Sequence, residues 1–189
     1  MLASTSPRRR ELLRDAGFRF EIAAPHVDER ELPGERPEAT ARRLALEKAR
    51  AVAARVARGA CVLGADTIVV IDGQQLGKPR DQAEAVEMLL RLAGRTHRVL
   101  TGFALLVGEL GLEETGVVES AVRMHPVDRA TAEKYAATGE PLDKAGAYAA
   151  QGEAGRFVAE ITGSRANVIG LPVEELVPRL ARVRVTPVE

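Results

Sequence analysis

The stretch that decides the fold is an apolar run in the first half of this 189-residue chain, interrupted only at Asp66-Thr67, which reads Cys61-Val62-Leu63-Gly64-Ala65-Asp66-Thr67-Ile68-Val69-Val70-Ile71. β-Branched residues fill its second half, and a short run of this kind bounded by turn residues is typical of a buried strand. Asp72-Gly73 follows directly and predicts a tight hairpin turn into residues 74–77. The stretch therefore predicts a buried strand that ends in a hairpin.

Predicted helices and strands alternate outward from this strand. The helices are expected to begin at Ser6-Pro7, Pro37, Asp81, Asp128 and Pro172, with the second running to Arg58 and the last kinked or shortened by Pro178. The other strands are expected over residues 1–3, 18–24, 96–107, 115–127 and 156–161, and the main loops over 26–37 and 140–155. This alternation predicts an α/β fold with a mixed sheet, in a single domain over residues 1–189.

The composition excludes several classes of protein. Hydrophobic residues make up 46% and charged residues 29%, which is the balance of an ordinary globular protein. Lys+Arg and Asp+Glu both number 27, so a zero net charge argues against binding long nucleic acid through bulk charge. The single Cys61 excludes a disulfide framework or a cysteine zinc site. Because the N-terminus turns polar at Ser4 and no long apolar stretch follows, we expect no membrane segment and a cytoplasmic protein.

Asp66 is the first residue that breaks its local pattern. A carboxylate in the centre of a buried strand is costly unless it is paired, hydrogen-bonded or bound to a metal. Gly64 and Ala65 leave room beside it for a ligand, which favours a functional role. The alternative is a structural ion pair.

Lys48 is the second, because it falls inside the apolar stripe of the second predicted helix, between Ala45 and Val52. A lysine there either extends along the helix to solvent or points its ammonium into a polar cleft. The sequence leaves both arrangements open.

A third departure is the run Arg8-Arg9-Arg10 in the first turn of the first predicted helix. Three cations oppose the positive end of the helix dipole unless an anion lies among them, and guanidinium groups beside unpaired N–H groups make a phosphate site. The alternative is that the side chains extend into water. The loop over residues 143–152 is a weaker signal, in which Lys144 and Gln151 offer a charge and an amide among small residues.

These departures fall in blocks that resemble the Maf nucleotide pyrophosphatases or, for Lys48, at a position that the family uses. The opening Ser4-Thr5-Ser6-Pro7-Arg8-Arg9-Arg10-Glu11-Leu12-Leu13 is similar to the family's S-x-S-P-R-R-x-E-L-L motif. The other blocks are Gly64-Ala65-Asp66-Thr67, Gly77-Lys78-Pro79, Asp143-Lys144-Ala145-Gly146-Ala147-Tyr148 with Gln151-Gly152, and Asn167-Val168-Ile169-Gly170-Leu171-Pro172. They occur in the family's order and span nearly the whole chain.

The resemblance implies a fold and a reaction. The fold is the one shared with inosine-triphosphate pyrophosphatases, a long mixed β-sheet with helices in two lobes around a cleft, so residues 1–189 are expected to form one two-lobed Maf-like domain. The reaction is hydrolysis of a nucleoside triphosphate between its α and β phosphates, giving a monophosphate and pyrophosphate. Arg8, Thr67 and Gln151 resemble the residues of the dTTP/UTP branch rather than those of the 7-methyl-GTP branch.

The resemblance also assigns roles to single residues. The expected catalytic residues are Asp66, Lys48 and Lys78, and the expected substrate-binding residues are Ser6, Arg8, Arg9, Thr67, Lys144 and Gln151. Glu29 and Asp66 are expected to bind a divalent cation, Mg²⁺ or Mn²⁺. Asp66 would share that metal or act as general base, and the sequence does not separate these roles. Gln151 would read the pyrimidine edge with its donor and its acceptor.

Other functions remain open at this point. The family takes its name from an effect on septum formation, so one alternative is a regulator that binds a nucleotide without hydrolysing it. The others are a pyrophosphatase for 7-methyl-GTP or one whose working substrates are modified pyrimidine triphosphates. The expected partner is a nucleoside triphosphate, with no long nucleic acid and no membrane, and a homodimer is the default assembly.

Overall fold

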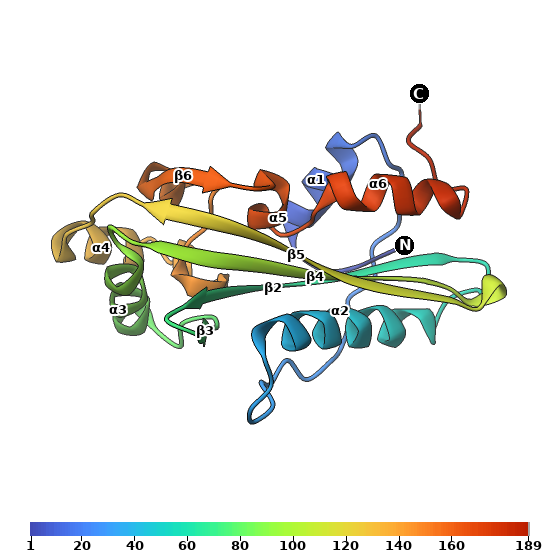
Figure 1. Cartoon of the computed structure of the whole chain (residues 1–189), viewed down its shortest axis with the longest axis horizontal. Coiled ribbons are helices and arrows are strands. Elements are labelled where there is room, and N and C mark those ends of the chain that lie inside the picture. The colour runs from blue at the N-terminus through green and yellow to red at the C-terminus, as the bar shows by residue number, and fades with distance from the viewer. Residues whose placement is uncertain (189) are drawn as a thin grey trace. The chain divides into compact units, whose positions relative to one another are not determined.

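The computed structural model describes residues 1–188 and contains one mixed sheet of six strands (Figure 1). The strand order is β1-β2-β4-β5-β6, with β3 paired to β2. The strands are β1 Leu2–Ala3, β2 Cys61–Ile71, β3 Gln74–Leu76, β4 Thr96–Val107, β5 Leu112–Met124 and β6 Val158–Thr162. β1 pairs with β2 in parallel, whereas β2–β3 and β5–β6 are antiparallel. The predicted α/β class with a mixed sheet is confirmed.

Six α-helices and four 3₁₀ turns connect the strands within the described part of the chain. The α-helices are α1 Pro7–Asp15, α2 Pro37–Ala53, α3 Gln82–Leu92, α4 Arg129–Ala136, α5 Arg165–Ile169 and α6 Val173–Arg182. The 3₁₀ turns are η1 Gly108–Leu110, η2 Glu140–Asp143, η3 Ala145–Ala147 and η4 Glu153–Phe157. Asp81 and Asp128 cap α3 and α4 as predicted, each accepting a bond from the backbone N–H three residues on.

Three predicted features differ from the structure, and one helix was not predicted. Residues 18–24 form no strand but a single bridge between Leu2 and Ile22, because their partner β1 is only two residues long. α2 ends at Ala53 rather than Arg58, and the chain tightens into turns after it. α6 continues through the exposed Pro178 to Arg182, so this proline does not end the helix. The five residues of α5 are too few to show a helical period in the sequence.

The described residues divide into two compact units, which we describe separately. Unit 1 contains Met1–Asp66, Thr101–Val118 and the chain from Gly170 onward, and unit 2 contains Thr67–Leu100 and Glu119–Ile169. Each unit has its own apolar core. That residues 1–189 form a single two-lobed domain stays a prediction.

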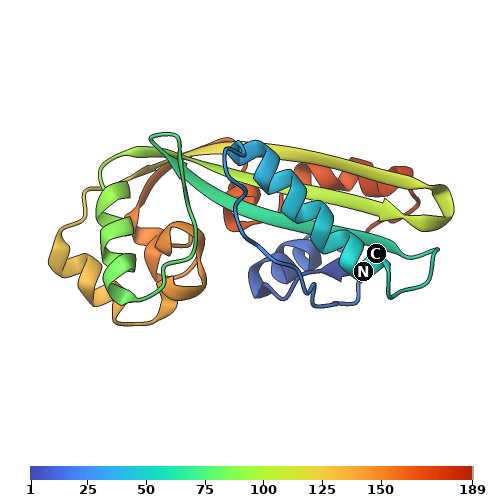
Figure 2. The same ribbon diagram turned by 90° about the horizontal axis from the view of Figure 1, so that it is seen from below.

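In unit 1, side chains of β2 alternate between two helical layers. Leu63 and Ala65 pack in a core with residues of α1 and α6, whereas Val62 packs in a core with residues of α2. Figures 1 and 2 show α2 and α6 on opposite faces of these strands. Since side chains alternate along a strand, Gly64 and Asp66 share the face of Val62 and are directed toward α2.

Two glycines let α2 lie unusually close to the sheet. A Cβ on Gly64 would lie 2.8 Å from the backbone nitrogen of Ala49 and closer still to the carbonyl oxygen of Ala45. A Cβ on Gly102 of β4 would likewise meet the backbone of α2 at Ala41. The absence of both side chains therefore sets the distance between α2 and its sheet.

Substitution of Gly64 by Ala should force α2 away from β2. We expect a loss of about 1–3 kcal/mol in the free energy of unfolding, because the new methyl group meets helix backbone rather than a movable side chain. Urea denaturation measures this loss. Gly77→Ala is the matched control, because a Cβ there meets nothing within 4 Å. Equal stability of the two variants would contradict the close approach.

Candidate active site

A cluster of three charged side chains lies between α2 and β2. Lys48 Nζ donates a 2.6 Å hydrogen bond to Asp66 Oδ1 and makes a 2.7 Å ion pair with Glu29 Oε1. Lys48 and Asp66 are buried, at 5% and 8% exposure, whereas the Glu29 side chain remains 45% exposed. The structure thus brings together three of the residues expected to act on substrate or metal.

The local fold explains why these side chains meet. Lys48 follows Ala45 by nearly one turn of α2, so it shares the face that packs on the strand, and Asp66 follows Gly64 on the strand face toward α2. Lys48 therefore points its ammonium into a polar cluster instead of extending to solvent. Asp66 forms an ion pair with Lys48, as the alternative of a structural pair predicts. Both partners are residues to which the Maf resemblance assigns catalysis.

The cluster offers carboxylate oxygens, the ligands that a hard divalent cation prefers. The two carboxylates and the ammonium sum to one negative charge, and both carboxylates converge on one nitrogen atom. Within residues 1–188 no group of three or more His, Cys, Asp or Glu side chains could hold a metal. Mg²⁺ is commonly held by one or two carboxylates plus substrate phosphates, so Glu29 and Asp66 fit it, while a zinc site of several protein ligands has no counterpart there.

The arginines of α1 lie in the same unit as this cluster. Arg9 Nε donates to the carbonyl oxygen of Gly170 at 2.8 Å and Nη1 donates to the buried Ser4 Oγ at 3.4 Å. Burial lowers the pKa of Arg9, and the negative charges of Asp66 and Glu29 oppose that shift. Arg9 therefore fastens α1 to the segment before α6 while lying in the electric field of the two carboxylates.

Two more predicted residues open α1. Arg8 is half-buried in the first turn and lowers the pKa of Arg9 by charge repulsion. Ser6 takes the N-cap position as predicted, but its side chain makes no capping bond; its backbone N–H donates to Ser4 Oγ at 3.2 Å. The first turn of α1 contains no acidic residue, so its N-terminus stays electropositive.

The other predicted residues belong to unit 2. Thr67 follows Asp66 directly and is half-buried, while Lys78 is exposed just after β3. The backbone N–H of Gly146 donates to the carbonyl oxygen of Gly77 at 3.0 Å, which places the loop of Lys144 beside the segment of Lys78. No contact described here tests the roles of these residues, so they stay predictions.

Lys144 and Gln151 differ in their surroundings. Lys144 is 8% exposed, and its ammonium donates to the carbonyl oxygen of Glu140 and to Asp143 Oδ1. Gln151 is exposed, and Ala150 beside it accepts a 3.3 Å bond from Arg165. Lys144 therefore stabilises the loop internally, whereas Gln151 lies at the surface.

The sequence analysis gave no role to Asn167, which is fully buried. Its Nδ2 donates to the carbonyl oxygen of Val99 at 3.1 Å and to Ser120 Oγ at 2.9 Å. A buried amide of this kind holds α5 against β4 and β5. Its position in a block of the Maf resemblance was the only signal available, because a single Asn has no periodicity.

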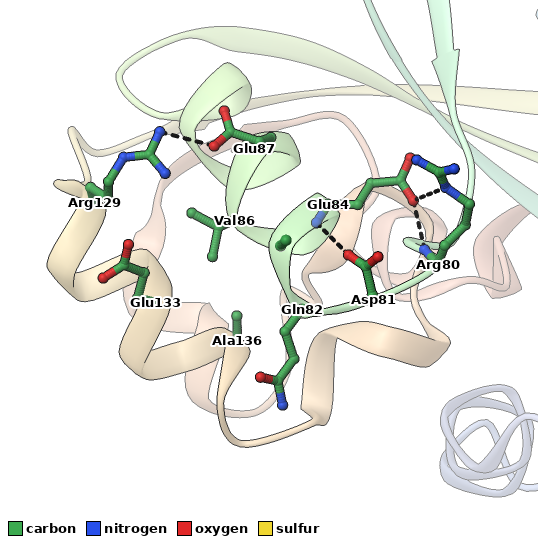
Figure 3. A pocket seen from close by; sticks show the side chains of 10 residues that line it. Arg80, Asp81, Gln82, Glu84, Val86, Glu87, Arg129, Glu133 and Ala136 are labelled. Carbon is green, nitrogen blue, oxygen red and sulfur yellow. Dashed lines mark hydrogen bonds and ion pairs between the residues drawn. The ribbon is translucent and has the colours of Figure 1, made fainter.

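A hollow of about 660 Å³ between α3 and α4 is a separate feature of unit 2 (Figure 3). Four of its charged side chains form two ion pairs, Arg80 with Glu84 and Arg129 with Glu87, each at 2.9 Å. None of the predicted site residues lines it. The hollow is therefore separate from the predicted site residues.

Nearly the whole chain is similar to proteins of one family. The chain is an α/β protein with a buried lysine between two carboxylates, and residues 1–183 match the family model described as Maf, Maf-like protein. The chain belongs to the Maf family.

Two relatives of known name support that assignment. A dTTP/UTP pyrophosphatase of Symbiobacterium thermophilum is 52% identical over 182 residues, covering 96% of this chain and 92% of its own. A dTTP/UTP pyrophosphatase of Myxococcus xanthus is 51% identical, covering 96% and 91%. A solved HAM1 protein from Coxiella burnetii has a TM-score of 0.48 and 17% identity, covering 96% of this chain and 97% of its own. No helix within residues 1–188 is long and apolar enough to span a membrane.

The loop that carries Lys144 and Gln151 is anchored by a buried aromatic pair. His97 Nε2 and the Tyr148 hydroxyl are 2.6 Å apart, and the rings meet edge to face at 5.3 Å. His97 is 2% exposed, and burial lowers its pKa from 6.5 to about 4. The imidazole is therefore neutral at pH 7 and holds the loop without charge.

The lowered pKa of His97 predicts a pH-dependent stability. Between pH 6.5 and pH 4 the unfolded chain binds a proton that the folded chain excludes, so the free energy of unfolding falls as the pH is lowered. We expect this group to contribute a loss of about 3 kcal/mol by pH 4. Urea denaturation at pH 7 and pH 4.5 tests this, with His97→Gln losing part of the slope and exposed His125→Gln keeping it. An unchanged slope in His97→Gln would exclude the effect.

Proposed function

We propose that this protein hydrolyses dTTP and UTP to the nucleoside monophosphate and pyrophosphate. The observation that carries the proposal is the convergence of Asp66 and Glu29 on the buried Lys48, in a chain of the Maf family. It matches two dTTP/UTP pyrophosphatases at about 50% identity over nearly their whole length. The protein is thus proposed as a hydrolase of the α–β phosphoanhydride bond.

The reaction adds one water molecule across that bond. The water oxygen forms a bond to phosphorus, the bridging P–O bond breaks, and pyrophosphate leaves with the bridging oxygen. A proton is lost from the water, and Asp66 would accept it in the role of general base. Asp66 and Glu29 would also hold Mg²⁺ or Mn²⁺, which when bound supplies positive charge to the phosphate oxygens.

Cations of the chain itself would share the charge of the triphosphate, which is about four negative charges at neutral pH. Lys48 holds both carboxylates in place, and it keeps them from repelling one another in the absence of substrate. Arg8, Arg9 and Ser6 at the N-terminus of α1 would bind phosphate oxygens, with Lys78 as a further cation. Thr67 and Lys144 complete the proposed substrate contacts.

The proposed compartment is the cytoplasm, and the proposed assembly is a homodimer. The first agrees with the single Cys61, since a chain with one cysteine forms no internal disulfide. The second follows from the frequency of two-fold dimers among enzymes.

Replacement of Asp66 by Asn tests the reaction. We expect pyrophosphate release from dTTP and UTP to fall by about 10²- to 10⁴-fold in kcat, because the amide can neither accept the proton nor balance a cation. Nucleotide binding, measured by calorimetry, should persist. Asp15→Asn, at the exposed end of α1, is the matched control and should keep full activity. No pyrophosphate from the wild-type protein would contradict the proposal and favour the nucleotide-binding regulator.

Replacement of Gln151 by Glu tests the choice of base. A carboxylate keeps the acceptor of the amide and removes its donor, so the ratio of UTP to GTP turnover should change more than the rate itself. Parallel kcat/KM measurements on both nucleotides give that ratio. Gln74→Glu, exposed on β3, is the control. An unchanged ratio would remove Gln151 from base recognition, and a preference of the wild type for 7-methyl-GTP would replace the proposed substrate.

A further inference from the structure

Glu29 lies in a long loop, yet its carboxylate is held against a buried lysine. The loop runs from about residue 24 to the start of α2 at Pro37 and contains no helix or strand. Residues 28–34 are all exposed. An extended segment of this kind does not place a side chain within hydrogen-bond distance of Lys48 by its own conformation. Inside the loop, Arg30 bonds to Asp28 on either side of Glu29, but these side chains are largely exposed and such a surface pair adds little stability. Contacts from outside the loop are therefore needed to hold Glu29 in place.

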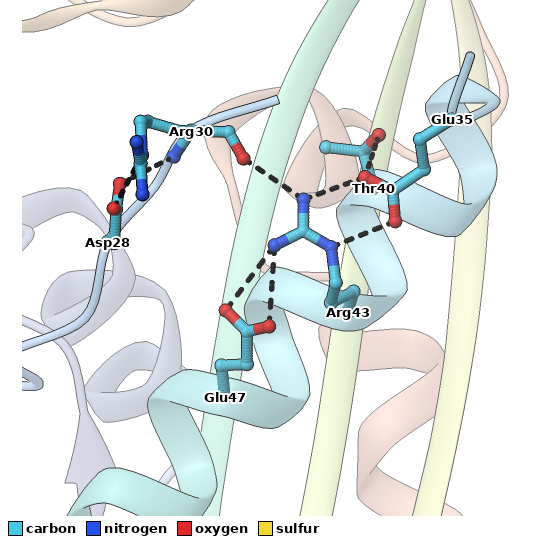
Figure 4. A network of polar contacts seen from close by, with 6 residues as sticks. All are labelled: Asp28, Arg30, Glu35, Thr40, Arg43 and Glu47. Carbon is cyan, nitrogen blue, oxygen red and sulfur yellow. Dashed lines mark hydrogen bonds and ion pairs between the residues drawn. The ribbon is translucent and has the colours of Figure 1, made fainter. Parts of the chain in front are cut away.

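The side chain of Arg43 makes the contacts that can do this (Figure 4). Its Nη2 donates at 3.1 Å to the carbonyl oxygen of Arg30, the residue directly after Glu29. Its Nε and Nη2 donate to the two oxygens of Glu35 at 2.8 Å and 2.7 Å, the forked geometry of a strong pair. Its Nη1 donates to Glu47, one turn along α2, at 3.3 Å. One guanidinium therefore ties both the middle and the end of the loop to α2.

Charge and burial make this network stiffer than a surface ion pair. The side chains of Arg43 and Glu35 are only 21% and 13% exposed. Hydrogen bonding to Arg43 lowers the pKa of Glu35, and the same pair raises the pKa of Arg43. Thr40 Oγ1 adds a 2.9 Å bond to Glu35 Oε2. Both partners thus stay ionised and oriented at neutral pH.

The position of Arg43 on α2 connects this network to the charged cluster. Lys48 holds the carboxylate of Glu29, and Arg43 holds the carbonyl oxygen of the next residue, so α2 grips the loop at two adjacent points. We propose that Arg43 is a positioning residue, which with Glu35 holds Glu29 beside Lys48 and Asp66 so that the two carboxylates can act together. The proposal rests on the proposed function for its effect on activity, but not for its effect on the loop.

The first test measures the loop itself, without substrate. Hydrogen exchange followed by mass spectrometry should show faster exchange of the amides of residues 25–36 in Arg43→Gln than in the wild type. Arg43→Lys should restore little of the protection, because an ammonium cannot make the fork to Glu35 and reach the Arg30 carbonyl together. Glu35→Gln removes the other partner of the pair, so the amides of residues 25–36 should exchange faster in this variant too.

Arg50→Gln is the matched control. Arg50 lies on the same helix and forks onto the exposed Glu113 at 2.9 Å and 2.6 Å, away from the loop. Its loss should leave the exchange of residues 25–36 unchanged. Equal exchange in Arg43→Gln and Arg50→Gln would overturn the proposal.

The second test asks what the positioning is for. Binding of Mn²⁺ to the protein without nucleotide, measured by electron paramagnetic resonance, should weaken about 10- to 100-fold in Arg43→Gln, the usual effect of removing a residue that orients a metal ligand. The Mn²⁺ concentration for half-maximal pyrophosphate release should rise in parallel, with the KM for dTTP changing less. A fall in kcat at unchanged Mn²⁺ affinity would overturn the metal-directed role.

The two tests distinguish a failure of the proposed function from a failure of the proposed role of Arg43. If the wild type releases no pyrophosphate, the proposed function fails, while exchange and Mn²⁺ binding still decide the role of Arg43. If Arg43→Gln does not fold, Arg43→Lys and Glu35→Gln carry the same measurements. In the double variant Arg43→Gln/Glu35→Gln the effects should be smaller than the sum of the single effects, because both residues belong to one contact.

Discussion

The close approach of α2 to β2 is the constraint on which the rest of the site depends. At Gly64 the helix backbone lies where a side chain would otherwise be. Two residues further along the strand, Asp66 accepts the hydrogen bond from Lys48. At that distance a lysine cannot reach water along the helix, so its ammonium is stabilised by the two carboxylates. Removing either carboxylate leaves buried charge with less compensation, which ties the stability of the helix–strand contact to the charges of the site.

Much of this arrangement could be predicted from the sequence, because its elements follow local rules. The strand from Cys61 to Ile71 and the caps of α3 and α4 are where propensity and capping place them. Lys48 and Asp66 were identifiable because each breaks an apolar pattern, and a residue that violates a local rule must be compensated elsewhere.

What could not be predicted depends on contacts between distant segments. The segment over residues 18–24 has the alternation of a strand, but the strand beside it is too short to continue a ladder. Arg43 looks like any surface arginine of an amphipathic helix, and only the folded loop brings the Arg30 carbonyl and Glu35 to its guanidinium. The bond from Arg9 to Gly170 joins residues 161 apart and has no sequence pattern.

The spacing of the charged cluster along the chain bears on how the protein folds. Glu29, Lys48 and Asp66 lie in one continuous stretch, and the bond from Lys48 to Asp66 closes a loop of only 18 residues. A contact of such short range costs little chain entropy, so α2 and β2 can associate early. Residues from Thr101 and from Gly170 join the same unit only after the chain has passed through the other one. The charges of this cluster would then assemble first, during synthesis, and the slower long-range contacts would close around them.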